Sequence, residues 1–277
     1  MKLRDLVLVK LGGSLITDKG AEDAARHEEI RRLAGELARV LASTGPDVPA
    51  LLLGHGSGSF GHVAARRHGF GGGLDASPAD RLRGAAAVQA KAAELHRIVL
   101  AALVEAGVPA FSAAPSSFLV ARAGRPVDVA AAPIAQALTH GLVPVVYGDV
   151  VLDRDAGAAI CSTESVLAAL AAALPERGFR PVRAAWLGET DGILDAGGAA
   201  IPEIRPGDAA AALAAAGAAA GADVTGGMAH RVETALLLAR RGVDSWIADG
   251  RRPGQIARAL GGMPAGGTRV VAVDHTA

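Results

Sequence analysis

Two lysines flank a pair of glycines near the start of the chain, in the segment VKLGGSLITDK. Lys10 ends an apolar run, Gly12 and Gly13 follow it, and Lys19 comes nine residues after Lys10. Paired glycines let backbone N–H groups approach phosphate oxygens closely, and lysines neutralise the charge that develops during phosphoryl transfer. The segment therefore indicates phosphoryl chemistry, although a plain turn with two solvated lysines would have the same sequence.

A second glycine loop, LLLGHGSGSFGH, follows another apolar run. Gly56, Gly58 and Gly61 match the pattern G-x-G-x-x-G, with Ser59 inside the pattern and His62 at its end. A nicotinamide site would have this pattern in the first strand–helix unit, whereas here it follows the second strand. The P-loop pattern G-x-x-x-x-G-K-[ST] does not occur in the sequence. We therefore interpret the segment as an anion-binding loop in which His62 donates a hydrogen bond to a phosphate.

A third glycine pair opens a predicted helix in the segment DVTGGMAHRVET. Gly226 and Gly227 form its first turn, and His230 and Arg231 come one turn later. Basic side chains near a helix amino terminus oppose the helix dipole, which is easier to explain if an anion lies between them. A simple capped helix is the alternative interpretation.

Two Gly/Asp pairs follow predicted strands. Gly148 and Asp149 occur in YGDVVLD, and Asp191 and Gly192 occur in ETDGIL. Carboxylates at strand ends in a phosphate site can orient lysines or hold Mg²⁺ through water, but Asp-Gly is also a common turn. No metal-ligand spacing such as H-x-x-x-H is present, so the sequence predicts no tightly bound transition metal.

Composition limits the possible partners and the compartment. The 277 residues include 28 basic and 28 acidic side chains, so no overall charge attracts nucleic acid or anionic lipid. The one cysteine, Cys161, can form no internal disulfide and is interpreted as a core residue. No signal peptide or membrane span is apparent, and we expect a cytoplasmic protein. His55 and His68 are interpreted as ordinary loop residues.

Short apolar runs alternate with helical segments along the chain, which predicts an α/β fold with a largely parallel sheet covered on both faces. Strands are predicted at 6–9, 50–53, 108–112, 142–147, 181–187, 244–248 and 268–273. Helices are predicted near 27–43, 78–106, 130–140, 163–174, 225–241 and 253–260. Two turn-rich segments, 118–129 and 150–162, are predicted hairpins, and the Ala/Gly-rich residues 195–224 are predicted to be a mobile loop.

Taken in order, the motifs VKLGGSLITDK, GHGSGSFGH, VPVVYGDVVLD, ETDGIL and DVTGGM resemble those of the amino acid kinase superfamily, and specifically of isopentenyl phosphate kinases. The SFGH ending separates this branch from acetylglutamate, aspartate and uridylate kinases, although fosfomycin kinase also has a histidine there. The resemblance implies an αβα sandwich that forms a homodimer. It also implies one domain over 1–277, with an acceptor-phosphate lobe at about 1–175 and a nucleotide lobe at 176–277.

The implied reaction is ATP-dependent, uses Mg²⁺, and converts isopentenyl phosphate or a similar alkyl monophosphate to the diphosphate. A phosphonate kinase of the fosfomycin kinase type and a non-catalytic nucleotide sensor are the alternatives. By resemblance, Lys10 would contact the transferring phosphoryl group, Lys19 would bridge donor and acceptor, and His62 would bind the acceptor phosphate. The acceptor site would comprise Gly56, Gly58, Ser59, Gly61, Gly148 and Asp149. The ATP site would comprise Gly12, Gly13, Glu164, Asp191, Gly192, Gly226, Gly227, Met228, His230 and Arg231.

The sequence departs from the family pattern at two places. Relatives commonly have Ser-Gly-Asp where this chain has Ser-Thr-Glu ending at Glu164, and a glutamate can perform the electrostatic role of an aspartate through a longer side chain. The family's lysine after the third glycine pair is replaced by His230 or Arg231, depending on the alignment. Arginine can clamp ATP phosphates with its planar fork, but it does not reproduce lysine geometry.

An apolar acceptor tail requires a pocket beside the phosphate loop. In the family, the region of residues 84–107 helps to enclose the short prenyl chain, and here it is rich in Ala, Val, Leu and Ile. Small side chains at Ala85, Ala86, Ala87 and Ala90 are expected to leave room for the tail. A core or interface helix would have a similar composition.

Overall fold

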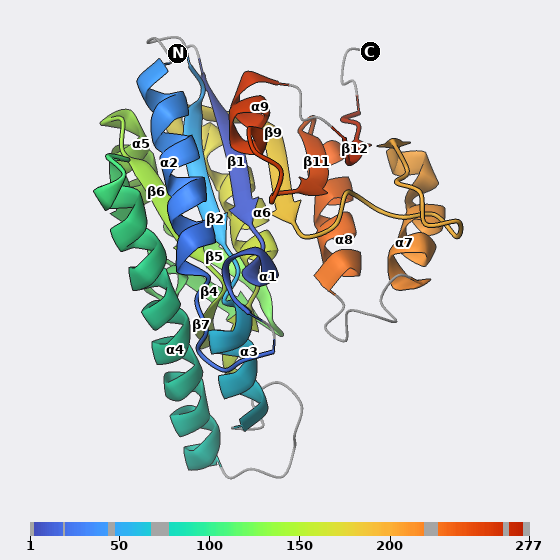
Figure 1. The fold of residues 1–277 in the computed structure, drawn as a ribbon. Helices are drawn as coiled ribbons and strands as arrows, with labels where there is room; N and C mark the ends of the chain where they lie inside the picture. Colours follow the sequence, from blue (N-terminus) through green and yellow to red (C-terminus); the bar gives the residue numbers. More distant parts are fainter. Residues whose placement is uncertain are drawn as a thin grey trace.

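A sheet of eight strands forms the centre of the molecule (Figure 1), in a computed structural model that describes residues 3–18, 20–43, 48–67, 78–218, 227–262 and 266–273. Its strands are β1 (Arg4–Leu11), β2 (Ala50–His55), β3 (Ala110–Ser112), β6 (Val143–Tyr147), β9 (Phe179–Gly188), β10 (Glu203–Ile204), β11 (Asp244–Asp249) and β12 (Thr268–Val270). The spatial order is β10-β12-β11-β9-β1-β2-β6-β3, and every neighbouring pair is parallel except β11 with β12. The predicted α/β fold with a largely parallel sheet is confirmed.

A second sheet of four strands is built from the two predicted hairpins. Its strands are β4 (Leu119–Arg122), β5 (Arg125–Val129), β7 (Asp149–Asp153) and β8 (Gly157–Cys161). Both hairpins are antiparallel, and β4 pairs in parallel with β7, so that the order is β5-β4-β7-β8. Cys161, at the end of β8, is buried as predicted.

Helices cover both faces of the main sheet, which gives the expected αβα sandwich. They are α1 (Gly13–Ile16), α2 (His27–Ser43), α3 (Gly58–Arg67), α4 (Pro78–Glu105), α5 (Ala132–Thr139), α6 (Thr163–Ala173), α7 (Ala209–Ala218), α8 (Gly227–Ala239) and α9 (Gln255–Gly261). Helices α2, α4 and α9 pack on one face, whereas α5, α6 and α8 pack on the other.

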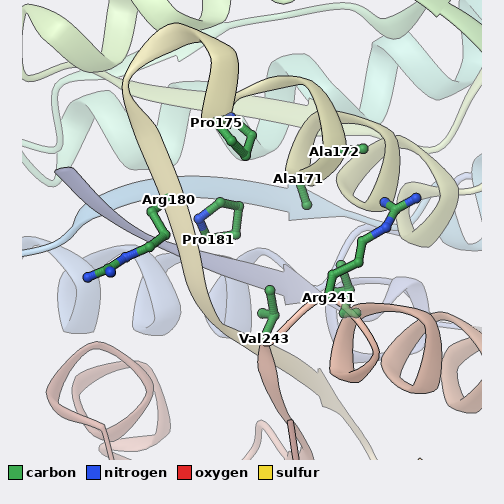
Figure 2. A pocket seen from close by; sticks show the side chains of 8 residues that line it. Ala171, Ala172, Pro175, Arg180, Pro181, Arg241 and Val243 are labelled. Carbon is green, nitrogen blue, oxygen red and sulfur yellow. The ribbon is translucent and has the colours of Figure 1, made fainter. Parts of the chain in front are cut away.

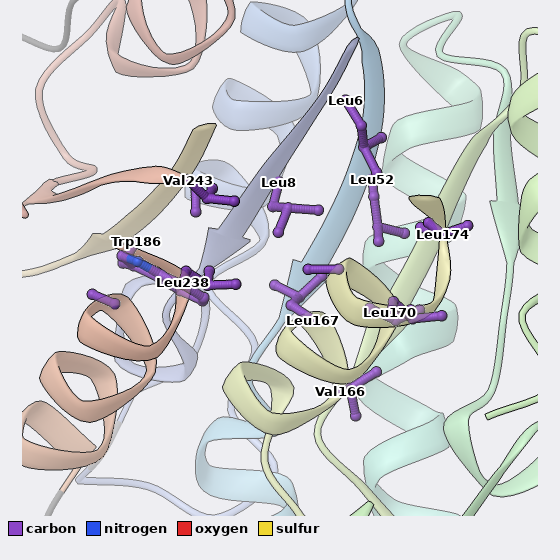
Figure 3. Packing of buried hydrophobic residues seen from close by; sticks show 14 of the residues in the cluster. Leu6, Leu8, Leu52, Val166, Leu167, Leu170, Leu174, Trp186, Leu238 and Val243 are labelled. Atoms are coloured by element: carbon purple, nitrogen blue, oxygen red, sulfur yellow. The ribbon is translucent and has the colours of Figure 1, made fainter. Parts of the chain in front are cut away.

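Successive side chains of β1 point to opposite faces of the sheet, and the hydrophobic core is therefore divided into two layers. Leu6 and Leu8 point toward α6 and α8, in the cluster shown in Figure 3, while Val7 and Val9 point toward α2 and α9. All four side chains are fully buried. A central strand that is apolar on both faces is typical of a doubly covered parallel sheet.

One predicted element is wrong. Residues 195–224 were expected to form a loop, but residues 209–218 form helix α7, and Glu203 and Ile204 form the short strand β10. Alanine has the highest helix propensity of all residues, which outweighs the glycines in this segment. Residues 219–224 lie outside the described part of the chain. Among the described residues, no helix has the length and apolar character needed to cross a bilayer.

Candidate functional site

The first two glycine loops lie side by side at the carboxyl edge of the main sheet. Strands β1 and β2 are parallel neighbours with Leu11 opposite His55, so Gly12 and Gly56 leave the sheet together. A Cβ at Gly13 would lie 2.7 Å from the backbone N and Cα of Gly58. The two loops are therefore in direct backbone contact, and only glycine fits there.

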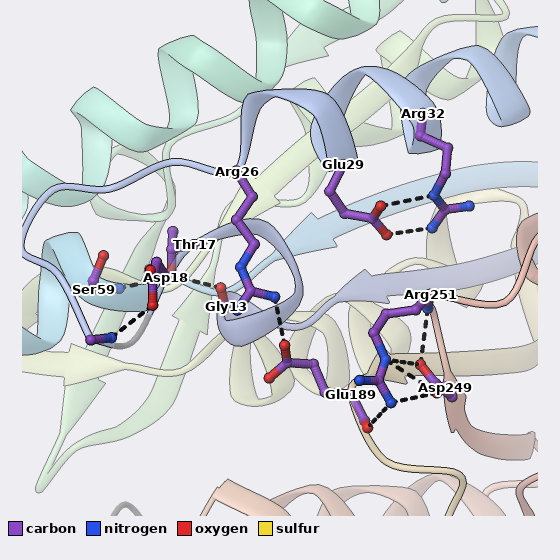
Figure 4. Close-up of polar contacts among 11 residues, drawn as sticks. Gly13, Thr17, Asp18, Arg26, Glu29, Arg32, Ser59, Glu189, Asp249 and Arg251 are labelled. Carbon is purple, nitrogen blue, oxygen red and sulfur yellow. Dashed lines mark hydrogen bonds and ion pairs between the residues drawn. The ribbon is translucent and has the colours of Figure 1, made fainter.

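A hydrogen-bonded threonine links these loops (Figure 4). The N–H of Ser59 donates to Thr17 Oγ1 at 3.0 Å, and that hydroxyl donates to the carbonyl of Gly13 at 2.8 Å. Gly58 has φ +51, which a side chain would strain, and it opens helix α3. The Ser59 hydroxyl oxygen is buried and has no hydrogen-bond partner among the described residues. A buried unpaired hydroxyl beside a helix start suits an anionic ligand.

Lys10 is buried at the end of β1 and pairs with the glutamate that departs from the family pattern. Its Nζ lies 2.6 Å from Glu164 Oε1, and both side chains are 7% exposed. Helix α6 places Glu164 in its first turn, where Ser162 caps the helix by accepting a bond from Ser165 N–H. Burial alone would raise the pKa of Glu164, but the charges of Lys10 and Arg231 outweigh it and lower the pKa to about 2. The carboxylate is therefore ionised and sits between two cations.

The structure distinguishes the two candidates for the family's lysine. Arg231 Nε lies 3.7 Å from Glu164 Oε1, and its guanidinium approaches Gly188 at the end of β9. His230 instead contacts the capping residues of α6, with Nε2 2.8 Å from Ser162 Oγ. Arg231 is therefore the cation that joins Lys10 and Glu164, and its buried Nε has no hydrogen-bond partner among the described residues.

Other predicted nucleotide residues lie around the ends of β9 and α8. Gly227 and Met228 begin helix α8, and Met228 packs against the core. Asp191 follows β9 and forms an ion pair with Arg252 at 2.8 Å, next to Gly192. Gly226 lies outside the described residues.

Asp149 is buried at the start of β7. Its carboxylate accepts the N–H groups of Ser116 and Val150 at 3.1 and 2.8 Å. Burial raises the pKa of Asp149, although these N–H donors oppose the shift. Glu164 pairs with Lys10, and the role of Asp149 in orienting the lysines stays a prediction. Gly148, just before it, lies against Thr163 and the backbone N of Ser57.

The remaining predicted catalytic residues are His62 and Lys19. His62 lies on helix α3 with an exposed side chain, four residues after the helix start, and Gly61 completes the first turn through its N–H bond to Ser57 O at 3.2 Å. Lys19 lies outside the described residues, as does His68.

His55 was interpreted as an ordinary loop residue, and this is wrong. It is fully buried, with Nε2 3.0 Å from His96 Nδ1 and Nδ1 3.0 Å from the carbonyl oxygen of Gly56. His96 Nε2 in turn lies 2.8 Å from Ser112 Oγ, and the rings of both histidines stack with Tyr147. His96 comes from helix α4, 41 residues away, so no local spacing pointed to this pair.

Ion pairs and hydrogen bonds connect the loops at the ends of β9 and β11 to helix α2 (Figure 4). Arg26 binds Glu189 at 2.6 Å, and Arg251 donates to Asp249 and to the carbonyl of Glu189. Arg32 donates to the carbonyl of Gly250 at 2.6 Å. These contacts hold the carboxyl edge of the sheet in place beneath the candidate site.

A cavity of about 320 Å³ lies at the other end of the sheet (Figure 2). Arg180 and Pro181, at the start of β9, line it together with Val243, which directly precedes β11. Parallel strands carry their ligand loops at the carboxyl edge, so this cavity is not part of the candidate site. No group of three or more His, Cys, Asp or Glu side chains suited to a metal ion occurs in the described ranges.

Comparison with known proteins agrees with the motif series. The Amino acid kinase family matches residues 5–249. Isopentenyl phosphate kinase of Methanothermobacter thermautotrophicus is 34% identical over 96% of this chain and 98% of that kinase, and the enzyme of Haloferax volcanii is 33% identical over 91% and 98%. A solved structure described as "X-ray structures of isopentenyl phosphate kinase" is 31% identical over 95% of this chain and 99% of that one, with a TM-score of 0.78. The chain therefore belongs to the amino acid kinase family and, within it, to the isopentenyl phosphate kinases.

Proposed function

We propose that this protein transfers the γ-phosphoryl group of ATP to isopentenyl phosphate, forming the diphosphate and ADP. The observation that carries the proposal is the buried cluster of Lys10, Glu164 and Arg231 at the edge where the first two glycine loops meet. Two buried cations held by one carboxylate provide net positive charge beside N–H-lined loops. The named relatives support this reaction, since their names state isopentenyl phosphate kinase activity.

The chemistry of this step requires charge neutralisation more than base catalysis. A phosphate monoester is already an anion near neutral pH, so its oxygen can attack the γ-phosphorus without losing a proton to the enzyme. The site must align two anions in line and stabilise the charge of the transferring group. We assign this stabilisation to Lys10 and to Lys19, with the Gly12–Gly13 loop holding the ATP phosphates. The N–H of Gly12 itself donates to the carbonyl of Leu187 at 2.7 Å, which fixes this loop against β9.

We assign the acceptor phosphate to the second glycine loop and the start of α3. The start of α3 has the direction of a helix amino terminus, which favours negative charge, although the Ser59 N–H itself donates to Thr17 Oγ1. The unpaired hydroxyl of Ser59 is available to the same phosphate. His62 would donate from the second turn of this helix. Gly56, Gly61, Gly148 and Asp149 would line the loop from behind.

We place the nucleotide on the other side of Lys10, along β9 and α8. Arg231 would clamp the ATP phosphates, and the surrounding surface would be formed by Glu164, Asp191, Gly192, Gly226, Gly227, Met228 and His230. We propose an acceptor lobe at about 1–175 and a nucleotide lobe at 176–277, with Gly12, Gly13 and Glu164 of the first lobe also facing ATP. Bound Mg²⁺ would neutralise phosphate charge, but the described residues form no carboxylate cluster for it. Mg²⁺ therefore enters the proposal only as part of the nucleotide substrate.

A small apolar cluster next to the loop supports an alkyl acceptor. Ala64 and Ala65 of α3 pack with Ala85 and Val88 of α4 and with Val150 of β7. Ala64 and Ala65 directly follow the phosphate loop along α3. A five-carbon tail attached to the phosphate would extend along this part of the helix. A fosfomycin-type acceptor, being small and polar, would gain little from such a surface.

The alanines of helix α4 named for the tail pocket do not share one side of the helix. Ala85 is buried in this cluster, whereas Ala86 and Ala90 are exposed. Their positions follow from the helical period of 3.6 residues, which turns them away from Ala85.

We further propose a homodimer, as the family resemblance implies. Phe111 in the edge strand β3 is 47% exposed, and Val104 near the end of α4 is 56% exposed. An unpaired sheet edge with apolar side chains favours association with a second copy. Sedimentation equilibrium should give twice the chain mass for the wild type and a weaker dimer for Phe111→Ser; a wild-type monomer would contradict the proposal.

The reaction is tested by ADP release with Mg·ATP and four acceptors: isopentenyl phosphate, dimethylallyl phosphate, a longer prenyl phosphate and fosfomycin. We expect the highest kcat/KM with the five-carbon phosphates, and a loss of at least tenfold in His62→Ala, since a charge-assisted hydrogen bond to phosphate would be removed. Turnover with fosfomycin alone would establish the phosphonate kinase alternative. ATP binding without turnover of any acceptor would establish the nucleotide sensor.

A further inference from the structure

Three hydrogen bonds run in one direction through the buried histidines to the phosphate loop. The carbonyl oxygen of Gly56 can only accept, so His55 Nδ1 must carry the proton that it receives. His55 Nε2 is then unprotonated in the neutral ring and accepts from His96 Nδ1. His96 Nε2 accepts in turn from the hydroxyl of Ser112. The geometry thus requires the Nδ1–H tautomer in both rings.

Both rings are neutral in this arrangement. Burial lowers the pKa of His55 to about 4 and that of His96 to about 3, and the nearby cations Lys10 and Arg97 act in the same direction. A proton added to His55 Nε2 would place two N–H donors face to face across the 3.0 Å between His55 and His96. The stacked ring of Tyr147 further restricts the orientation of both imidazoles.

The last bond of the chain fixes a peptide plane in the loop. The peptide between Gly56 and Ser57 is planar and trans, so its N–H points opposite to its C=O. With the carbonyl bound to the buried His55, the Ser57 N–H points away from the imidazole. The Ser57 nitrogen lies close to Gly148, 3.7 Å from where a Cβ on that glycine would be. In the described part of the chain this N–H has no hydrogen-bond acceptor.

We propose that His55 and His96 are positioning residues for the acceptor phosphate: they hold the Gly56 carbonyl and thereby aim the Ser57 N–H at that phosphate. The inference rests on the proposed function, because it takes the anion in this loop to be the acceptor. His96 belongs to α4, and Ala85 of the same helix packs beside the loop. The series of hydrogen bonds therefore also couples α4, the helix next to the acceptor tail, to the loop that binds the acceptor phosphate.

Two isosteric substitutions separate positioning from simple packing. The side-chain amide of asparagine places its N–H near the position of His Nδ1, so His55→Asn keeps the bond to the Gly56 carbonyl and loses the contact with His96. Glutamine reaches the position of Nε2, so His55→Gln keeps the His96 contact and loses the bond to Gly56. His140→Gln, at an exposed histidine after α5, is the matched control.

We expect His55→Gln to raise KM for isopentenyl phosphate about tenfold, as loss of an oriented donor to a charged group would. KM for ATP should stay within about twofold, and His55→Asn should retain an acceptor KM within about threefold of the wild type. A role limited to core packing would instead make the smaller asparagine the more damaging change and would alter both KM values together. Either of these results would overturn the inference.

A second readout does not depend on turnover. Long-range ¹H–¹⁵N NMR of the histidine rings should show the proton on Nδ1 in both His55 and His96, and an Nε2–H tautomer at His55 would overturn the inference. If the wild type failed to phosphorylate isopentenyl phosphate, the proposed function would fall, and calorimetric titration with inorganic phosphate would decide the inference separately. Weaker phosphate binding by His55→Gln than by His55→Asn would support it, and equal binding would refute it.

Discussion

Replacing Glu164 with glutamine removes the one described carboxylate that pairs with both Lys10 and Arg231, while it preserves the size of the side chain. The pKa of Glu164 falls from 4.5 in an exposed setting to about 2 in the folded protein. At about 1.36 kcal/mol per pKa unit, this corresponds to roughly 3 kcal/mol of stabilisation at pH 7. We expect Glu164→Gln to lower the free energy of unfolding by about that amount.

The stabilisation by Glu164 depends on pH in a defined direction. Because its pKa is lower in the folded than in the unfolded state, the contribution is complete above about pH 5 and is lost as the pH falls toward 2. The difference in unfolding free energy between the wild type and Glu164→Gln should therefore shrink by about 2 kcal/mol between pH 7 and pH 3. All other titrating groups are shared by the two proteins, so the difference isolates this carboxylate.

The assay is urea unfolding at pH 7, 5, 4 and 3, followed by the fluorescence of the two tryptophans, Trp186 and Trp246, which are both buried. Glu105→Gln, at an exposed position at the end of α4, serves as the control and should leave stability within about 0.5 kcal/mol of the wild type. A difference for Glu164→Gln that stays below 1 kcal/mol, or that does not change with pH, would refute the assignment of Glu164 as the ionised centre of the cluster.

Three further substitutions test other parts of the site. Lys10→Met should reduce kcat by roughly 10²–10³ with little change in either KM, as removal of one transition-state donor does, and retention of more than a tenth of kcat in steady-state assays would contradict this. Arg231→Lys should raise KM for ATP about threefold to tenfold and leave the acceptor KM unchanged. A change confined to the acceptor KM would contradict the assignment of Arg231 to the ATP phosphates. Gly13→Ala should cost at least about 2 kcal/mol in thermal unfolding and abolish turnover, because its Cβ would lie 2.7 Å from the facing backbone. Gly35→Ala, where nothing lies within 4 Å, should instead stabilise helix α2 by about 0.5–1 kcal/mol, and equal losses in the two variants would contradict the close contact of the loops.

Most of the main sheet could be predicted because its strands are short apolar runs bounded by glycine and proline. Strands β1, β2, β9 and β11 contain the predicted runs and extend them by a few residues at most, and β6 begins one residue after the start of the predicted run 142–147. The glycine loops could also be predicted as neighbours, since parallel strands bring their carboxyl ends to one edge. Helix α7 was missed because glycine was given more weight than the alanine-rich composition around it.

The polar interior of the site could not be predicted from local patterns. Lys10 and Glu164 are 154 residues apart, and only the packing of α6 against β1 brings them together. Sequence position alone does not distinguish His230 from Arg231, because both lie in the same turn of α8 and only the direction of their side chains separates them. His55 and His96 form a pair through tertiary contact alone.

The most direct test of the central claim is ³¹P NMR of isopentenyl phosphate incubated with Mg·ATP and the protein. The account predicts that the single resonance of the monophosphate is replaced by the two coupled resonances of a diphosphate ester, with one ADP formed for each product. Lys10→Met should slow this conversion by roughly 10²–10³. A monophosphate resonance that persists while the wild-type protein binds ATP, or ADP formation accompanied only by inorganic phosphate, would contradict it.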